Sequence, residues 1–83
     1  MAKQHIDGLL TDLHEKFATS ETSPQQEALL QQLRGQLIDW DGPRPDGSVV
    51  TTAELLLEEL EEEHPHLSHA VRELIDALGK IGI

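Results

Sequence analysis

The sequence predicts an all-α protein, a small helical bundle in which an N-terminal helical hairpin packs on a kinked C-terminal helix pair. Large apolar residues, mostly leucine, recur every three or four positions, which is the period of one face of an α-helix. The chain has one Phe, one Trp and no Tyr, whereas β-sheets are enriched in aromatic and β-branched residues. Its 83 residues suffice for one domain, 1–83, with a small core.

The predicted N-terminal hairpin consists of two amphipathic helices, at about residues 3–18 and 24–40. The apolar stripe of the first helix is Ile6, Leu10, Leu13 and Phe17, and that of the second is Leu30, Leu33, Leu37 and Trp40. Ser23 and Gln26 form a capping-box pattern, and Pro24 suits the first helical position. We therefore expect the second helix to begin at Pro24.

A loop and a second helix start follow. The stretch 41–50 opens with two prolines, two glycines and a Pro-Asp-Gly turn signal, so it is expected to be the longest loop. Thr51 and Glu54 then form a second capping-box pattern. The third helix is therefore predicted at about 52–64.

The apolar positions of the C-terminal half keep one heptad phase. They are Ala53, Leu57, Leu60, Leu67, Val71, Leu74, Leu78 and Ile81, and His64 completes the series. Pro65 interrupts this pattern, because a proline inside a helix removes a hydrogen bond and clashes with the preceding turn. Either the helix ends at His64 and a new one begins at Pro65, or one long helix is kinked there. The unbroken phase favours two near-collinear helices, about 52–64 and 65–79.

Two glycines lie within the predicted helices or at their ends. Gly35 marks either a close approach of two helices or an exposed position that tolerates glycine. Gly79 is expected to end the last helix.

Charge and composition exclude several classes of partner. The formal net charge is −10, which disfavours nucleic acid and anionic membranes because both need clustered Lys and Arg. No run of roughly 18 apolar residues could span a bilayer, and acidic and basic residues interrupt the first 20 positions, unlike the apolar run of a signal peptide. The chain has no cysteine, as is common in the reducing cytosol. We expect a cytoplasmic protein.

One run of acidic residues is the candidate interaction surface. It consists of Glu58, Glu59, Glu61, Glu62 and Glu63. Like charges four positions apart destabilise a helix, so the run either serves to meet a basic protein partner or is a solvated face that keeps the chain soluble.

Three histidines flank the proline, and they are the candidate metal ligands. His66 and His69 share a helical face, and His64 precedes Pro65. Their spacing matches no established ligand pattern, so local roles compete with a metal-responsive function. The sequence contains no Gly-rich phosphate loop, Cys nucleophile or nucleophile-elbow serine. We expect no catalytic residue, no cofactor and no enzymatic activity.

The C-terminal residues carry a family resemblance. The stretch Glu62-Glu63-His64-Pro65-His66-Leu67, followed by Val71-Arg72-Glu73-Leu74-Ile75-Asp76-Ala77-Leu78 and the terminal Gly82-Ile83, resembles a family of short bacterial proteins of unknown function. These mostly proteobacterial proteins end in Glu-His-Pro, an Arg-x-Leu-x-Asp-x-Leu run and Gly-Ile. The resemblance implies a helical bacterial protein and no activity, cofactor or catalytic residue. Arg72 and Asp76, four positions apart, are expected to form a helix-surface ion pair.

The apolar residues outnumber those that the predicted seams need. Leu9, Leu29, Ile38, Leu55, Leu56 and Ile75 widen the apolar faces. Either the bundle buries them itself, or a second copy covers one face, and we expect a homodimer. The predicted function is a non-enzymatic, self-associating protein-interaction module. The alternatives are an acidic decoy of a basic or nucleic-acid-binding surface, and the metal-responsive protein.

Overall fold

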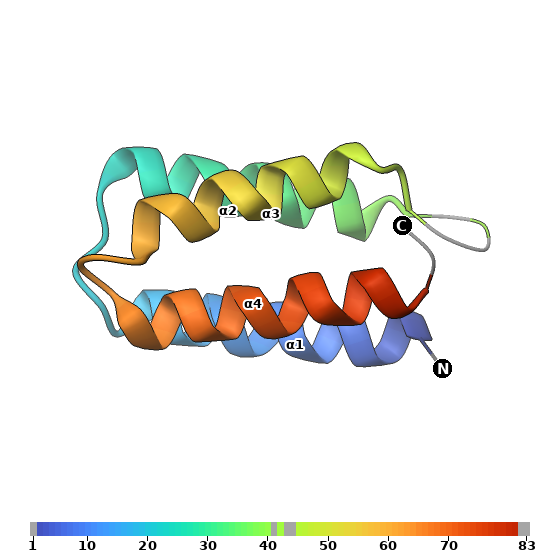
Figure 1. Cartoon of the computed structure of the whole chain (residues 1–83), viewed down its shortest axis with the longest axis horizontal. Helices are drawn as coiled ribbons and strands as arrows, with labels where there is room; N and C mark the ends of the chain where they lie inside the picture. Colours follow the sequence, from blue (N-terminus) through green and yellow to red (C-terminus); the bar gives the residue numbers. More distant parts are fainter. Residues whose placement is uncertain (1, 41, 43–44, 82–83) are drawn as a thin grey trace.

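The computed structural model describes residues 2–40, 42 and 45–81, and over these residues the protein is an all-helical, up-and-down four-helix bundle. Its helices are α1 (Ala2–Ala18), α2 (Pro24–Ile38), α3 (Ser48–Leu60) and α4 (Pro65–Lys80). Each helix runs back along its predecessor, and α4 closes the bundle by packing on α1 as well as on α3 (Figure 1). The α1–α2 and α3–α4 turns therefore lie at the same end of the bundle.

The first two helices confirm the predicted hairpin. The Ser23 hydroxyl accepts a hydrogen bond from the Gln26 backbone N–H at 3.1 Å, and the Gln26 side chain accepts one from the Ser23 backbone N–H at 2.9 Å. Helix α2 ends at Ile38, two residues earlier than predicted. Trp40, beyond that end, is still nine-tenths buried, and the Lys3 ammonium lies 5.2 Å from the centre of its ring.

The near-collinear arrangement predicted for the C-terminal half is wrong. Helix α3 ends at Leu60, residues 61–63 form a turn, and α4 begins at Pro65 and returns along α3 (Figure 1). The two helices form a second hairpin, whose facing sides bury both Leu60 and Leu67. Helix α4 also continues through Gly79 to Lys80, so that glycine is not the stop.

The predicted start of α3 is also wrong. The helix begins at Ser48, inside the expected loop 41–50, and Thr51 lies within it rather than capping it. The Asp46 carboxylate accepts a hydrogen bond from the Ser48 backbone N–H at 2.9 Å. The extra turn brings Val49 into the core, where it is fully buried, and this apolar burial stabilises the longer helix.

All four helices contribute to one apolar core. The buried residues at its centre include Ile6, Leu13, Leu33, Leu37, Val49, Leu56, Leu60, Leu67, Val71, Leu74 and Leu78. Among the described residues, the buried polar side chains are Gln26, Thr52 and Ser68, and each forms hydrogen bonds. The Gln26 amide donates to the Glu59 carbonyl at 3.0 Å and so connects α2 to α3.

The two capping-box patterns differ in expected effect on stability. Ser23→Ala should lower the free energy of unfolding by about 1 kcal/mol, because it removes an observed N-cap hydrogen bond. Thr51→Ala should leave it unchanged or raise it slightly, because Thr51 is exposed within a helix and alanine is the better helix former. Urea denaturation of the two variants measures the difference. A loss in Thr51→Ala as large as that in Ser23→Ala would contradict the observed start of α3.

Candidate interaction surface

The acidic run lies at one end of the bundle. Glu58 and Glu59 are in the last turn of α3, and Glu61, Glu62 and Glu63 form the α3–α4 turn; all five are exposed. The Glu61 carboxylate accepts a 2.9 Å bond from the Arg72 guanidinium. Within the described part of the chain, the other four carboxylates form no ion pair. The run is therefore a solvated acidic surface in which, over the described residues, one carboxylate is ion-paired.

Arg72 and Asp76 do not pair with each other as expected. Arg72 reaches across the hairpin to Glu61, and Asp76 lies 3.6 Å from the Lys80 ammonium on its own helix. All these side chains are exposed, so each pair contributes at most about 1 kcal/mol. Arg72 therefore connects α4 to the α3–α4 turn, which the sequence separation of 11 residues did not indicate.

A shallow groove lies between α3 and α4, and its lining combines apolar and acidic residues. Its volume is about 520 Å³. Leu57 and Ile75, both half-buried, supply the apolar lining. The charged lining residues are Glu54, His69, Arg72, Glu73 and Asp76. The lining thus includes three carboxylates, of which Glu73 contacts His69 and Asp76 pairs with Lys80, while Arg72 pairs with Glu61. We call this the α3–α4 groove.

Sequence reasoning missed this groove. It placed Leu57 in the central seam and treated Ile75 as a widening of an apolar face. The signal was present, because Glu54 and Leu57 lie three positions apart on one side of α3, and Arg72, Ile75 and Asp76 lie close together on α4. The two sets become one surface only when α4 folds back on α3.

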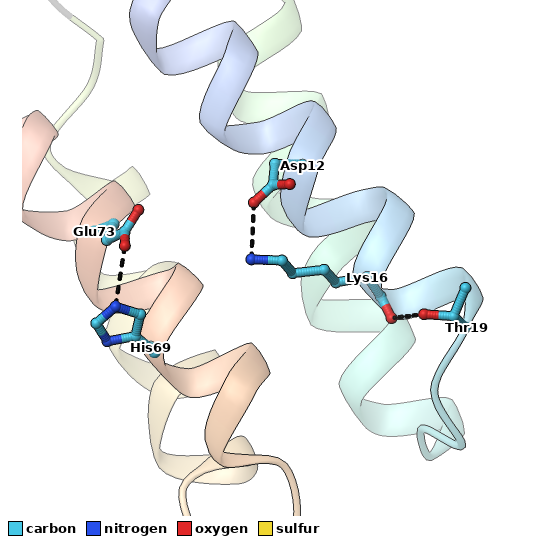
Figure 2. A network of polar contacts seen from close by, with 5 residues as sticks. All are labelled: Asp12, Lys16, Thr19, His69 and Glu73. Carbon is cyan, nitrogen blue, oxygen red and sulfur yellow. Dashed lines mark hydrogen bonds and ion pairs between the residues drawn. The ribbon is translucent and has the colours of Figure 1, made fainter.

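The three candidate metal ligands occupy different environments. His64 is half-buried at the N-terminal end of α4, without a side-chain hydrogen bond that caps the helix. His66 and His69 are exposed, and His69 Nε2 lies 3.0 Å from a Glu73 carboxylate oxygen (Figure 2). Over residues 2–40, 42 and 45–81, no three histidine or acidic side chains converge as a metal-binding group. The three histidines therefore belong to no common metal-binding group in the described residues.

Figure 2 shows a second pair opposite His69 and Glu73. The Lys16 ammonium on α1 lies 3.0 Å from Asp12 and points toward α4, and the Thr19 hydroxyl donates to the Lys16 carbonyl at 3.1 Å. Both pairs join residues four positions apart on one helix. The Asp12–Lys16 ion pair stabilises α1 by a few tenths of a kcal/mol, roughly, whereas the His69–Glu73 contact is an ion pair only when the imidazole is protonated.

Comparisons with known proteins give one match. A family model described as a domain of unknown function, DUF4404, matches residues 6–83. No curated protein and no solved structure matches the chain. The match confirms the expected kinship with a family of unknown function. Among the described helices, none has the length and apolarity needed to cross a membrane.

Proposed function

The chain belongs to the DUF4404 family of unknown function, and on that premise we propose that it is a non-enzymatic, self-associating protein-interaction module. In this proposal it binds a basic protein through the α3–α4 groove. The same proposal includes self-association as a homodimer and a cytoplasmic location. It also includes an origin among short, mostly proteobacterial proteins with the same C-terminal motif.

The lining of the α3–α4 groove is the observation that carries the proposal. Leu57 and Ile75 are only half-buried, so an apolar side chain of a partner can cover them and remove further apolar surface from water. Carboxylates from both helices surround them. Burial supplies affinity, and charge complementarity supplies specificity and a faster association. A partner helix with apolar residues flanked by Lys or Arg meets both requirements.

Reversal of two groove charges tests this function. Glu54→Lys combined with Asp76→Lys changes the groove, and Glu15→Lys combined with Glu21→Lys changes the net charge equally at exposed positions on α1 and in the following turn. The partner is first enriched from lysate on the immobilised wild-type chain, then identified, purified and titrated against all three proteins by calorimetry.

We expect the groove variant to bind at least about tenfold more weakly than the wild type. The control should bind like the wild type, and affinity should fall with added salt. Equal affinities for the groove variant and the control, or enrichment of only the chain itself, would contradict a groove-mediated function.

An acidic decoy is the second candidate function, and the exposed run at residues 58–63 favours it. Four of its carboxylates form no ion pair in the described structure, and their clustered negative charge is like that of nucleic-acid phosphates. A decoy would displace a labelled DNA duplex from a basic DNA-binding protein. Glu58→Gln, Glu62→Gln and Glu63→Gln together should abolish that displacement, while the Glu54 and Asp76 reversal should not. No displacement by the wild type would remove this candidate.

A further inference from the structure

Arg34 on α2 differs from the other basic side chains of the described structure. The chain has 16 acidic residues and only 6 Lys and Arg, and Lys3, Lys16, Arg72 and Lys80 each lie 2.9–3.9 Å from a carboxylate oxygen. Among the described residues, Arg34 forms no ion pair, although it is half-buried. The positions three and four residues away on its own helix are leucine, glutamine and isoleucine, so α2 itself supplies no counter-charge at that spacing.

This arginine lines a concave surface between α1 and α2, which we call the Arg34 hollow. Its volume is about 350 Å³. In the described structure α1 and α3 each contact α2 and α4, so the α1–α2 side lies opposite the α3–α4 groove (Figure 1). The hollow is lined from α1 by Lys3, Asp7, Leu10, Thr11 and His14, and from α2 by Arg34 and Ile38.

The apolar part of the hollow contains a second residue without a partner. Ile38 is 63% exposed, more than any other large apolar side chain in the described structure. It lies four positions after Arg34, on the same side of α2. Leu10, which is almost fully buried, forms the apolar floor beside it. An arginine without an ion pair and the most exposed isoleucine therefore share one concave site.

The remaining charges of the hollow offset each other. The Lys3 ammonium lies 3.9 Å from the Asp7 carboxylate. Arg34 is therefore the positive charge that this site leaves without a counter-charge in the described structure, within a chain of net charge −10. The exposed side chains of Thr11 and His14 add a hydroxyl and a ring nitrogen that can donate hydrogen bonds.

We propose that the Arg34 hollow binds a small monocarboxylate with a short apolar chain. The guanidinium pairs with the carboxylate, whose geometry it matches with two N–H donors, and the apolar chain covers Ile38. One ligand thus supplies both missing partners. Small-molecule sites have volumes of roughly 300–1,000 Å³, so a hollow at the lower end of this range suits a compact ligand.

Titration of the full chain with hexanoate, followed by NMR of the backbone amides, tests the site. Hexanoate should shift the signals around the Arg34 hollow, reach saturation and leave the α3–α4 groove unchanged. Hexan-1-ol has the chain without the charge, and acetate has the charge without the chain. Each should bind at least about tenfold more weakly than hexanoate, because a hydrogen bond to a charged group or the burial of two methylene groups is then lost.

Two matched pairs of variants locate the ligand. Arg34→Gln and Arg72→Gln each remove one positive charge, from the Arg34 hollow and from the α3–α4 groove. Ile38→Gln and Leu55→Gln each replace an exposed large apolar residue, of which Ile38 lines the hollow. Arg34→Gln should weaken hexanoate binding at least about tenfold, and Ile38→Gln about fourfold or more. The two controls should bind like the wild type, and circular dichroism checks that all four are folded.

Several outcomes would overturn the site. They are signals that do not shift or do not saturate, equal binding of hexanoate and hexan-1-ol, and equal losses in Arg34→Gln and Arg72→Gln, which would mean that the ligand responds to net charge alone. The proposed function is tested at the opposite side of the bundle with a basic protein. Failure of the carboxylate site therefore leaves binding at the α3–α4 groove in place, and failure of that binding leaves this site in place.

Discussion

Leu74→Ala is expected to remove roughly 2–5 kcal/mol from the free energy of unfolding. Leu74 is fully buried in the middle of α4, within the core to which all four helices contribute. A domain of this length has a total stability of about 4–12 kcal/mol. The substitution should therefore shift the urea midpoint of circular dichroism far toward zero, and it should leave part of the chain unfolded at room temperature if the wild type lies near the lower bound.

The neighbouring residue provides the control. Ile75 is half-buried at the α3–α4 groove, so Ile75→Ala should cost about 1 kcal/mol. The two substitutions are adjacent in the same helix and lose a similar side chain, so a difference between them reports burial rather than helix propensity. Equal losses would mean that the inward face of α4 does not centre on Leu74.

The N-terminal half of the fold was predictable because the spacing of its apolar residues fits two separate amphipathic helices and no other arrangement of the segment. Leu13 and Leu33, placed on helical stripes by their spacing, are fully buried. The capping box at Ser23 is complete, and Pro24 occupies the first turn of the helix that it caps. The exposure of the acidic run was also predictable, since carboxylates without partners remain in water. Exposure follows from residue type, whereas a surface shared by two helices depends on how they are arranged.

The C-terminal half was mispredicted because the spacing of apolar residues does not show whether the next helix continues in the same direction or turns back. Leu60 and Leu67 are seven positions apart, a spacing that fits a continuous helix. It fits two antiparallel helices equally well, because each needs only its own stripe to face the core. Pro65 favours a new helix, as the first helical position suits its fixed backbone angle. Doubling back also covers the apolar face of α4 with both α1 and α3, which a collinear pair would leave in water.

The predicted start of α3 was wrong for a local reason. Thr51 and Glu54 match a capping box, but the Asp46 carboxylate meets the first N–H group of α3 one turn earlier. That earlier start permits the burial of Val49. The burial of Val49 and the hydrogen bond to Asp46 therefore favour the earlier helix start over the one that the cap motif predicted. The sequence had placed Asp46 in a turn signal.

The register of α3 leads to the second large effect. The predicted seam placed Leu57 at the core, whereas the structure buries Leu56 completely and leaves Leu57 half-buried at the α3–α4 groove. Leu56→Ala should thus cost roughly 2–5 kcal/mol, because it removes core atoms and leaves a cavity. Leu57→Ala should cost about 1 kcal/mol, because water already reaches part of that side chain. Parallel urea titrations measure both values.

Leu57→Ala should also affect binding, and this separates the two leucines further. It removes apolar lining from the α3–α4 groove, so a groove-binding partner should lose affinity although the variant remains folded. Leu56 contributes nothing to that lining, so any loss of binding in Leu56→Ala should follow the unfolded fraction and disappear when stability is restored. If Leu57→Ala proved as destabilising as Leu56→Ala, the helix would be rotated relative to the arrangement described, and the groove would lose half of its apolar lining.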